Sequence, residues 1–182
     1  EIVTYGMTEA DDPLHKGASH LSPQKFHEAL EDPSAVVIDV RNANETLIGR
    51  FAPPGGAEYI DPRMRRSTEF PEWVRRNKAK LEGKKILMYC TGGVRCERAS
   101  AFLTQEGIRP HGQLEGGIHR YLETYKEEGG HWVGKNYVFD RRFAHGADKH
   151  DVVSRCGACF ESWDRYQAGA RCPSCSMEVL VC

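Results

Sequence analysis

One short loop carries residues that could do sulfur chemistry. The apolar run Ile86–Tyr89 leads straight into Cys90-Thr91-Gly92-Gly93-Val94-Arg95, and a helical pattern follows. Paired glycines let the backbone bend so that N–H groups surround the cysteine sulfur, while the helix N-terminus and Arg95 add positive charge. An anionic sulfur is favoured there, as a thiolate or as a persulfide. We therefore predict that Cys90 is a nucleophile that needs no histidine partner.

Two other interpretations of this loop compete with the nucleophile. A cysteine at the end of a buried strand can be purely structural, although such a residue needs neither the glycines nor the arginine. A cysteine phosphatase would place five residues between the cysteine and the arginine, whereas four intervene here. Cys96, at the first turn of the following helix, is a candidate resolving thiol for Cys90 and equally a half-buried helix residue.

Four further cysteines have the spacing of a metal site. Cys156 and Cys159 form one C-x-x-C pair and Cys172 and Cys175 form a second, each among turn residues. Two such turns bring four thiolates to one ion, so we predict a closed, structural zinc site, with an iron–sulfur site or disulfides as alternatives. Cys182, at the C-terminus, receives no role. Cysteine usage of this kind fits metal ligation and reactive thiols in a reducing compartment.

Alternating strand-like and helix-like segments must position the Cys90 loop. Ser22-Pro23 has the pattern of a helix start, and the continuous apolar run 35–40 is typical of a strand buried on both faces. Helical patterns also cover 96–106 and 118–125, the second after a strand-like Gln113-Leu114 and two glycines. This alternation predicts a parallel α/β sheet, in which ligands bind at the carboxyl ends of the strands, where Cys90 lies.

Composition divides the chain into a main domain and a small appendage. We expect a domain over 1–139 that begins with a lead-in strand at 2–5, a polar linker over 140–153 and a four-cysteine module over 154–182. The proline- and glycine-containing stretch 51–70 is interpreted as a long surface connection. A chain of 182 residues, 40% of them hydrophobic, is large enough for one substantial core.

The charge distribution and hydropathy limit the classes of partner. The chain has a net charge of -1, yet residues 63–85 hold nine basic and three acidic residues, a face that suits either phosphate groups or plain solvation. No apolar run is long enough to cross a bilayer and no signal peptide opens the chain. We expect a cytoplasmic protein, with the nucleus as a second compartment.

Three motifs together resemble the rhodanese superfamily. They are Ile38-Asp39-Val40-Arg41, the loop Cys90–Arg95, and Leu114-Glu115-Gly116-Gly117. The resemblance implies a parallel five-stranded α/β sheet flanked by helices and a persulfide carried on Cys90. The cysteine spacing adds a small, zinc-ribbon-like module at the C-terminus. By the same resemblance Asp39 and Arg41 occupy the family's Asp-Val-Arg position, where we favour a structural salt bridge over direct catalysis.

A second set of motifs is similar to the tRNA wobble-uridine hydroxylase family. It comprises Tyr89–Arg98, Asp39–Asn42 and Phe70–Trp73. Members of that family, and a vertebrate rhodanese-like relative, pair a rhodanese domain with a cysteine-bearing C-terminal extension. They also carry a domain before the rhodanese unit, and because the sequence opens at Glu1 without an initiator Met, we expect it to be a piece of a longer protein.

Three functions follow from these patterns. The first is a sulfurtransferase that moves sulfane sulfur from a donor through Cys90 to a thiol acceptor. The second, implied by the hydroxylase resemblance, is tRNA modification with Cys90 essential and with the basic stretch 63–85 and the zinc module holding the tRNA. The third is a non-catalytic module that binds protein or RNA through its zinc knuckles.

Overall fold

The computed structural model describes residues 5, 7, 17–138, 144–148, 150–167 and 169–182. Its helices are α2 (Pro23–Leu30), α3 (Ala43–Thr46), the 3-10 helix η1 (Ser67–Glu69), α4 (Phe70–Leu81), α5 (Val94–Gln105) and α6 (Gly117–Thr124). Its strands are β1 (His20–Leu21), β2 (Ala35–Asp39), β3 (Gly49–Phe51), β4 (Glu58–Ile60), β5 (Lys85–Tyr89), β6 (Gly112–Leu114), β7 (Trp132–Gly134), β8 (Asn136–Tyr137) and β9 (Ala144–His145).

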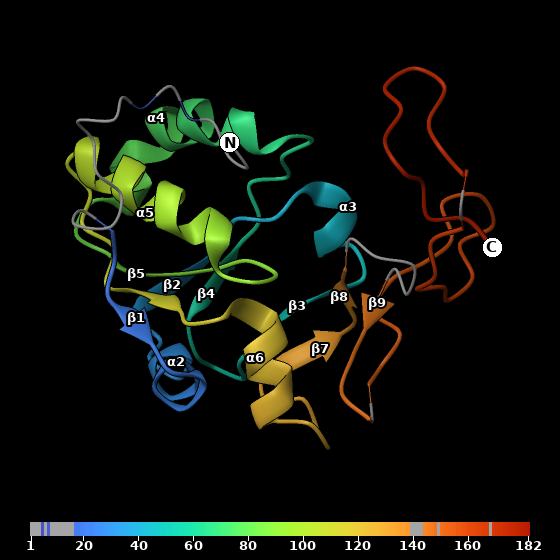
Figure 1. The fold of residues 1–182 in the computed structure, drawn as a ribbon, viewed down its shortest axis with the longest axis horizontal. Helices are drawn as coiled ribbons and strands as arrows, with labels where there is room; N and C mark the ends of the chain where they lie inside the picture. Colours follow the sequence, from blue (N-terminus) through green and yellow to red (C-terminus); the bar gives the residue numbers. More distant parts are fainter. Residues whose placement is uncertain (1–4, 6, 8–16, 139–143, 149, 168) are drawn as a thin grey trace.

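A five-stranded sheet forms the centre of the molecule, with the order β1-β6-β5-β2-β4. Each neighbouring pair in this sheet is parallel. Figure 1 shows α4 and α5 on one face of the sheet and α2 and α6 on the other. This arrangement confirms the predicted parallel α/β fold and places the carboxyl ends of β2 and β5 side by side.

Side chains of strand β2 pack into the hydrophobic layers on both faces of the sheet. All five of its residues are buried. Because successive side chains of a strand point to opposite faces, Val36 and Ile38 pack beneath α4 and α5 while Ala35 and Val37 pack beneath α2. Strand β5 divides its side chains in the same way, with Ile86 and Met88 in the first cluster. The continuous run is therefore the signature of a central strand with both faces covered.

Local signals place the helix that begins after β1. Ser22 caps α2 by accepting a hydrogen bond from the Lys25 N–H at 3.4 Å, and Pro23 occupies the first helical position. Phe26 and Leu30 are fully buried on its inner side. The predicted helix start and its apolar face are thus confirmed, and the same holds for the helical patterns that became α5 and α6.

The interpretation of residues 51–70 as a plain connection was wrong. Strand β4 lies in this stretch and pairs with β2 in parallel register, with Val37 beside Tyr59, and thereby becomes the edge of the sheet. The strand is short, and its three residues are at least partly exposed and show no apolar alternation, so no local pattern indicated a strand. Helix α4, which follows directly, was also not predicted.

Other boundaries remain as expectations. The lead-in strand at 2–5 lies outside the described residues except for Tyr5, and so does 140–143 of the expected linker. Within that linker, Ala144–His145 forms β9 and pairs with β8. Figure 1 shows the C-terminal residues beside α3, β8 and β9, away from β1 and α2. No helix in the described ranges is both long and apolar enough to cross a membrane.

A buried ion pair fastens the end of β2. The Arg41 guanidinium donates to both oxygens of Asp39, at 2.9 and 2.7 Å, and both side chains are fully buried. The Asp39 carboxylate also accepts hydrogen bonds from the hydroxyls of Tyr59 and Tyr89. It therefore connects the end of β2 with β4 and with the end of β5. These contacts match the structural interpretation of the Asp-Val-Arg motif.

We predict that Asp39→Asn destabilises the fold. The change removes the negative charge that compensates Arg41, and breaking one partner of a buried pair costs about 3–5 kcal/mol. The free energy of unfolding in urea measures this loss. Asp32→Asn is the matched control, because the Asp32 side chain is one-third exposed in its pair with Lys85 and an exposed pair contributes at most about 1 kcal/mol. A loss for Asp39→Asn no larger than that of the control would contradict the prediction.

Candidate active site at the Cys90 loop

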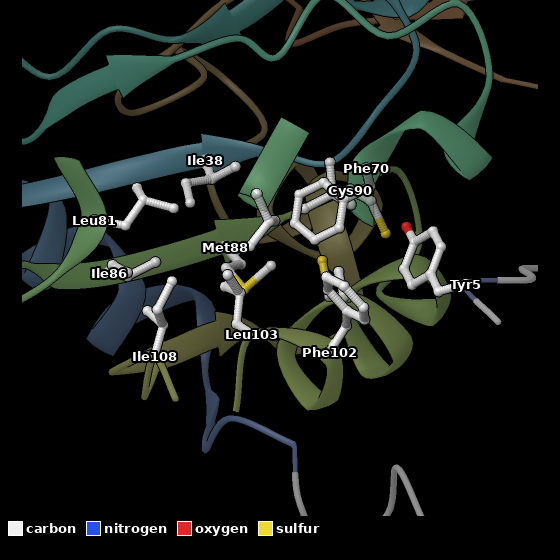
Figure 2. Packing of buried hydrophobic residues seen from close by; sticks show 14 of the residues in the cluster. Tyr5, Ile38, Phe70, Leu81, Ile86, Met88, Cys90, Phe102, Leu103 and Ile108 are labelled. Atoms are coloured by element: carbon white, nitrogen blue, oxygen red, sulfur yellow. The ribbon is translucent and has the colours of Figure 1, made fainter. Parts of the chain in front are cut away.

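Cys90 lies where β5 ends, at the carboxyl edge of the sheet and just before α5. Its side chain is only 1% exposed and belongs to the hydrophobic cluster under α4 and α5. Figure 2 shows it at one end of that cluster, with Phe70 and Tyr5 nearby. A sulfur in such a place carries a negative charge only if polar groups of the protein replace the water that solvates an exposed thiolate.

The backbone of the loop supplies those polar groups. The Gly93 N–H donates to the Cys90 sulfur at 3.1 Å, and the N–H groups of Arg95 and Cys96 also act on it. Gly93 has φ of 91°, a left-handed conformation that glycine adopts without strain. It caps α5, so the sulfur lies at the positive end of a 12-residue helix. The predicted ring of inward N–H groups is present.

These contacts make Cys90 acidic. A hydrogen bond from the Cys96 side chain is the largest cause, and the charge of Arg95 and the backbone N–H groups add to it; together they outweigh burial and lower the pKa of Cys90 to about 6. Burial and the neighbouring Cys90 sulfur raise the pKa of Cys96 well above its usual value. Cys96 is fully buried, not half-buried, and at neutral pH it is a thiol beside a thiolate.

Arg95 is held by a residue that sequence analysis missed. The Glu45 carboxylate accepts from both terminal nitrogens of Arg95, at 2.6 and 2.7 Å, and from the Thr91 hydroxyl at 3.1 Å. Glu45 is fully buried, and its pKa is lowered because the Arg95 hydrogen bonds and charge outweigh desolvation. One signal for this role was available: Asn42 and Glu45 form a capping box at the start of α3.

The glycine pair at the start of α6 closes the loop from the other side. The Ile118 N–H donates to the Cys90 carbonyl at 3.0 Å and the His119 N–H donates to the Thr91 carbonyl at 3.1 Å. A Cβ on Gly117 would lie 2.6 Å from both carbonyl oxygens, so a glycine is needed for this approach. The motif Leu114–Gly117 therefore positions the loop and does not touch the sulfur.

A cavity of about 610 Å³ opens beside the loop. It is lined by loop residues Gly92, Gly93 and Val94 and, from the far side, by Glu115 and Gly116. Val94 is 54% exposed at its rim. Cys90 is not among the lining residues, so the cavity adjoins the loop backbone and not the buried sulfur.

Tyr5 is a second residue that the sequence did not single out. Its ring packs 5.5 Å from the Phe70 ring, and it lies close enough to the two thiols and Arg95 to feel their charges. Its buried hydroxyl has no hydrogen-bond partner among the described residues. No local pattern in the lead-in segment could have indicated this position.

The C-terminal cysteines form a cluster that differs from the predicted set. The sulfurs of Cys156, Cys159 and Cys182 all lie within 4.8 Å of one another, and those of Cys159 and Cys182 are 3.5 Å apart. Sulfurs bound to one zinc ion lie about 3.8 Å apart, so this trio could hold a metal ion. Cys172 and Cys175 do not belong to the cluster. Cys182, to which no role was given, takes part because the chain folds back past the first C-x-x-C turn.

Both C-x-x-C turns nevertheless share one backbone design. In each, the N–H of the first cysteine donates to the carbonyl five residues later, at 2.8 Å. The fourth residue after it, Phe160 or Ser176, has a left-handed φ of 65° or 58°. Backbone N–H groups, chiefly those of Cys159 and Cys175, lower the pKa of Cys156 to about 6 and lower that of Cys172. In each turn, backbone N–H groups therefore favour the anionic form of the first cysteine.

Comparison with known families agrees with this geometry. The family model described as "Rhodanese-like domain" matches residues 22–124, which hold the sheet, the Cys90 loop and α6. The chain belongs to the rhodanese family. A second model, "Rhodanase C-terminal", matches residues 133–182 and so includes the cysteine cluster of this rhodanese-family chain.

Relatives of this rhodanese-family chain extend the similarity beyond the domain. Rhodanese-like domain-containing protein 6 of Arabidopsis thaliana is 40% identical over the whole chain, which covers 33% of that protein. The tRNA uridine(34) hydroxylase of Acholeplasma laidlawii is 41% identical over the whole chain, which covers 56% of that enzyme. A similarly named Brucella ovis protein is 42% identical over 98% of the chain. The chain thus spans about half or less of these relatives.

Solved structures agree on the fold alone. A Rhodopseudomonas palustris protein of unknown function, described as a possible tyrosine phosphatase, superposes with a TM-score of 0.50 at 18% identity. The match covers 67% of this chain and 94% of the other.

We predict that Cys96→Ala raises the pKa of Cys90 above about 6. The change removes the thiol that donates to the Cys90 sulfur, so the thiolate, populated above its pKa, would form only at higher pH. The rate at which iodoacetamide modifies Cys90, followed by peptide mass spectrometry between about pH 5 and 9, reports the midpoint. Cys96→Ser is the control, because its hydroxyl keeps a donor beside the Cys90 sulfur and the midpoint therefore stays nearer to that of the wild type. An unchanged midpoint in Cys96→Ala would show that the loop backbone alone sets the pKa.

Proposed function

We propose that this chain is the rhodanese-containing part of a tRNA-modifying enzyme that hydroxylates a uridine, with Cys90 as its nucleophile. The observation that carries this proposal is the similarity to tRNA uridine(34) hydroxylases along the entire chain, C-terminal cysteines included. The Cys90 loop supports it, because its N–H groups and Arg95 favour a thiolate at neutral pH.

Uracil offers such a thiolate a suitable target. The C5=C6 double bond is conjugated with the C4 carbonyl, so C6 is electron-poor and accepts a nucleophile. Addition of the Cys90 sulfur to C6 would move the electron pair of that double bond towards C5 and the carbonyl, leaving C5 ready to attack an oxygen donor. Introduction of the oxygen consumes a two-electron oxidant, which is a co-substrate in this proposal. Release of the proton from C5 and of the sulfur from C6 would restore the ring.

Sulfur transfer is the second candidate function, and one observation favours it. The Gly93 N–H that lies 3.1 Å from the Cys90 sulfur belongs to a ring of donors that would stabilise an anionic persulfide equally well. In that function the Cys90 thiolate takes the outer sulfur from a sulfane donor and passes it to a thiol acceptor. Both candidates need the same thiolate, so they differ only in product.

We predict that Cys90→Ser abolishes hydroxylation and leaves tRNA binding unchanged. Serine keeps the size of the side chain but is not ionised at neutral pH, so the nucleophile is lost while the surface is not. Nucleoside mass spectrometry of tRNA from cells that express the natural protein or its variant measures the product.

Intact mass after incubation with thiosulfate separates the two candidates. Two results together would favour sulfur transfer: the wild-type chain gains one sulfur atom from thiosulfate, and tRNA from cells that express it carries no hydroxylated uridine. Hydroxylated uridine persisting in Cys90→Ser would overturn the role of Cys90 in the modification.

We further infer that the C-terminal cysteines hold a structural zinc ion. Thiolate sulfur is a ligand that zinc prefers, and Cys156 and Cys159 belong both to the predicted four-cysteine set and to the observed cluster. The shared backbone of the two turns supports Cys172 and Cys175 as the remaining ligands, and the cluster supports Cys182. Bound zinc would hold the C-terminal segment in place, since sulfur ligands on all sides leave no position for substrate.

We predict that Cys156→Ser loses zinc and lowers the melting temperature, because it removes a ligand common to both sets. Metal content per chain, measured by plasma emission spectrometry, gives the answer. The pair Cys172→Ser and Cys182→Ser identifies the other ligands, since only true ligands lose the metal when replaced. One zinc per chain in Cys156→Ser would contradict the inference.

A further inference from the structure

A cavity of about 990 Å³ lies outside the Cys90 site, along the edge of the sheet. Its walls come from the edge strand β4, the adjacent helix α4, helix α3 with the start of β3, and residues 153–155 of the C-terminal segment. The cavity therefore lies where the rhodanese unit meets the cysteine-bearing segment. Its volume is at the upper end of the range for ligand pockets.

Positive charge dominates the lining. Arg50, Arg63, Lys80 and Arg155 contribute four cations, against the two carboxylates of Glu58 and Asp61. Within the described part of the chain, none of the four cations forms an ion pair. A polyanion that entered the cavity would not have to displace a carboxylate from any of them.

Other cations of α4 differ in this respect. Arg75 pairs with Glu106 at 2.9 Å and Arg76 pairs with Glu72, and neither lines the cavity. Of the nine basic residues of 63–85, only Arg63 and Lys80 line the cavity. Lys85 pairs with Asp32, as Arg75 and Arg76 pair with their carboxylates, and the other four basic residues of the stretch do not line the cavity.

The cavity also offers an aromatic face and a strained backbone. Trp73 lines it half-buried, with its ring stacked 5.9 Å from the Phe70 ring and its carbonyl accepting from the Asn77 side chain. Arg63 has φ of 54°, held by a hydrogen bond from its N–H to the Asp61 carboxylate at 2.7 Å. Such a conformation is strained for a residue other than glycine, and strained backbone clusters at functional positions.

We propose that this cavity binds single-stranded RNA, with phosphates at the unpaired cations and a base stacked on Trp73. Cations along a groove combined with an aromatic platform are the recurring means of holding unpaired nucleotides. The inference rests on the proposed function, because it names the surface that holds the tRNA next to the Cys90 loop. Thr46 lines the cavity, while its neighbour Glu45 holds Arg95 and Thr91 of that loop. Helix α3 thus connects the two sites.

The test compares two double variants of the full chain that remove the same amount of charge. Lys80→Gln with Arg155→Gln removes two unpaired cations from the cavity, and Arg75→Gln with Arg76→Gln removes two paired cations from α4. The probe is a fluorescently labelled RNA stem-loop with the target uridine in its loop, and its anisotropy gives the dissociation constant at several salt concentrations. For single strands, loss of two phosphate contacts reduces the slope of log K against log salt by about 1.4. We expect this reduction for the cavity variant and the wild-type slope for the control.

Trp73→Leu supplies an independent measurement. Loss of one stacked base weakens binding by about tenfold and leaves the salt slope unchanged. Circular dichroism checks that this variant, whose side chain also contacts the core, remains folded. If it does not, the pair of double variants decides alone.

Four outcomes would overturn the proposal, and only the last of them would also overturn the proposed function. Equal slopes of log K against log salt in the two double variants would place the RNA on another surface. Displacement of the labelled RNA by an acidic peptide, but not by unlabelled RNA, would assign the cavity to a different ligand. Normal binding by the cavity variant, together with loss of hydroxylation in Cys90→Ser, would refute the cavity and leave the function standing. A wild-type chain that does not bind the stem-loop would refute both.

Discussion

A negative charge on a sulfur that is 1% exposed is the constraint around which this structure is arranged. Water does not solvate the Cys90 thiolate, so the protein must provide the solvation itself. It does so with the Gly93 N–H, the start of α5 and the Cys96 thiol, all of which are contributed by one strand–loop–helix segment. The loop can hold this shape only because Gly117 lets α6 approach its carbonyl groups. The same backbone therefore packs α6 against the loop and stabilises the negative charge on the sulfur.

Arg95 illustrates how a buried charge requires a chain of partners. Its guanidinium lowers the pKa of Cys90, yet it is itself nearly buried and needs a carboxylate. Glu45 meets this need and also binds Thr91, so two residues of the Cys90 loop are fixed by a four-residue helix. The pair formed by Asp39 and Arg41 follows the same principle at the end of the adjacent strand. Two carboxylate–guanidinium pairs at neighbouring strand ends explain why the carboxyl edge of the sheet tolerates so much charge.

What could be predicted from the sequence depended on distance along the chain. The Cys90 loop, the buried strand at 35–39 and the cap of α2 are local patterns, and each was recognised from contiguous residues. Glu45 lies 50 residues before Arg95, so only the fold brings them together. Cys182 meets Cys159 across 23 residues for the same reason. Strand β4 was not predicted because its three residues, at the edge of the sheet, are too few to show an apolar alternation. It is nevertheless the fifth strand of the sheet.

The C-terminal segment is attached to the element that supports the active-site loop, and this has a structural consequence. Tyr166 donates a hydrogen bond from its hydroxyl to the carbonyl of Asn44, in α3. Asp164 forms an ion pair at 2.9 Å with Lys135, the residue that separates β7 from β8. Glu45, the next residue after Asn44, holds Arg95. A change in how the cysteine turns are folded would therefore act on α3 from one side, while the Cys90 loop contacts it from the other. Local stability of a helix this short comes from such contacts and not from its own hydrogen bonds. The cysteine-bearing segment therefore contacts the helix that holds Arg95, and through it the loop of the reactive sulfur.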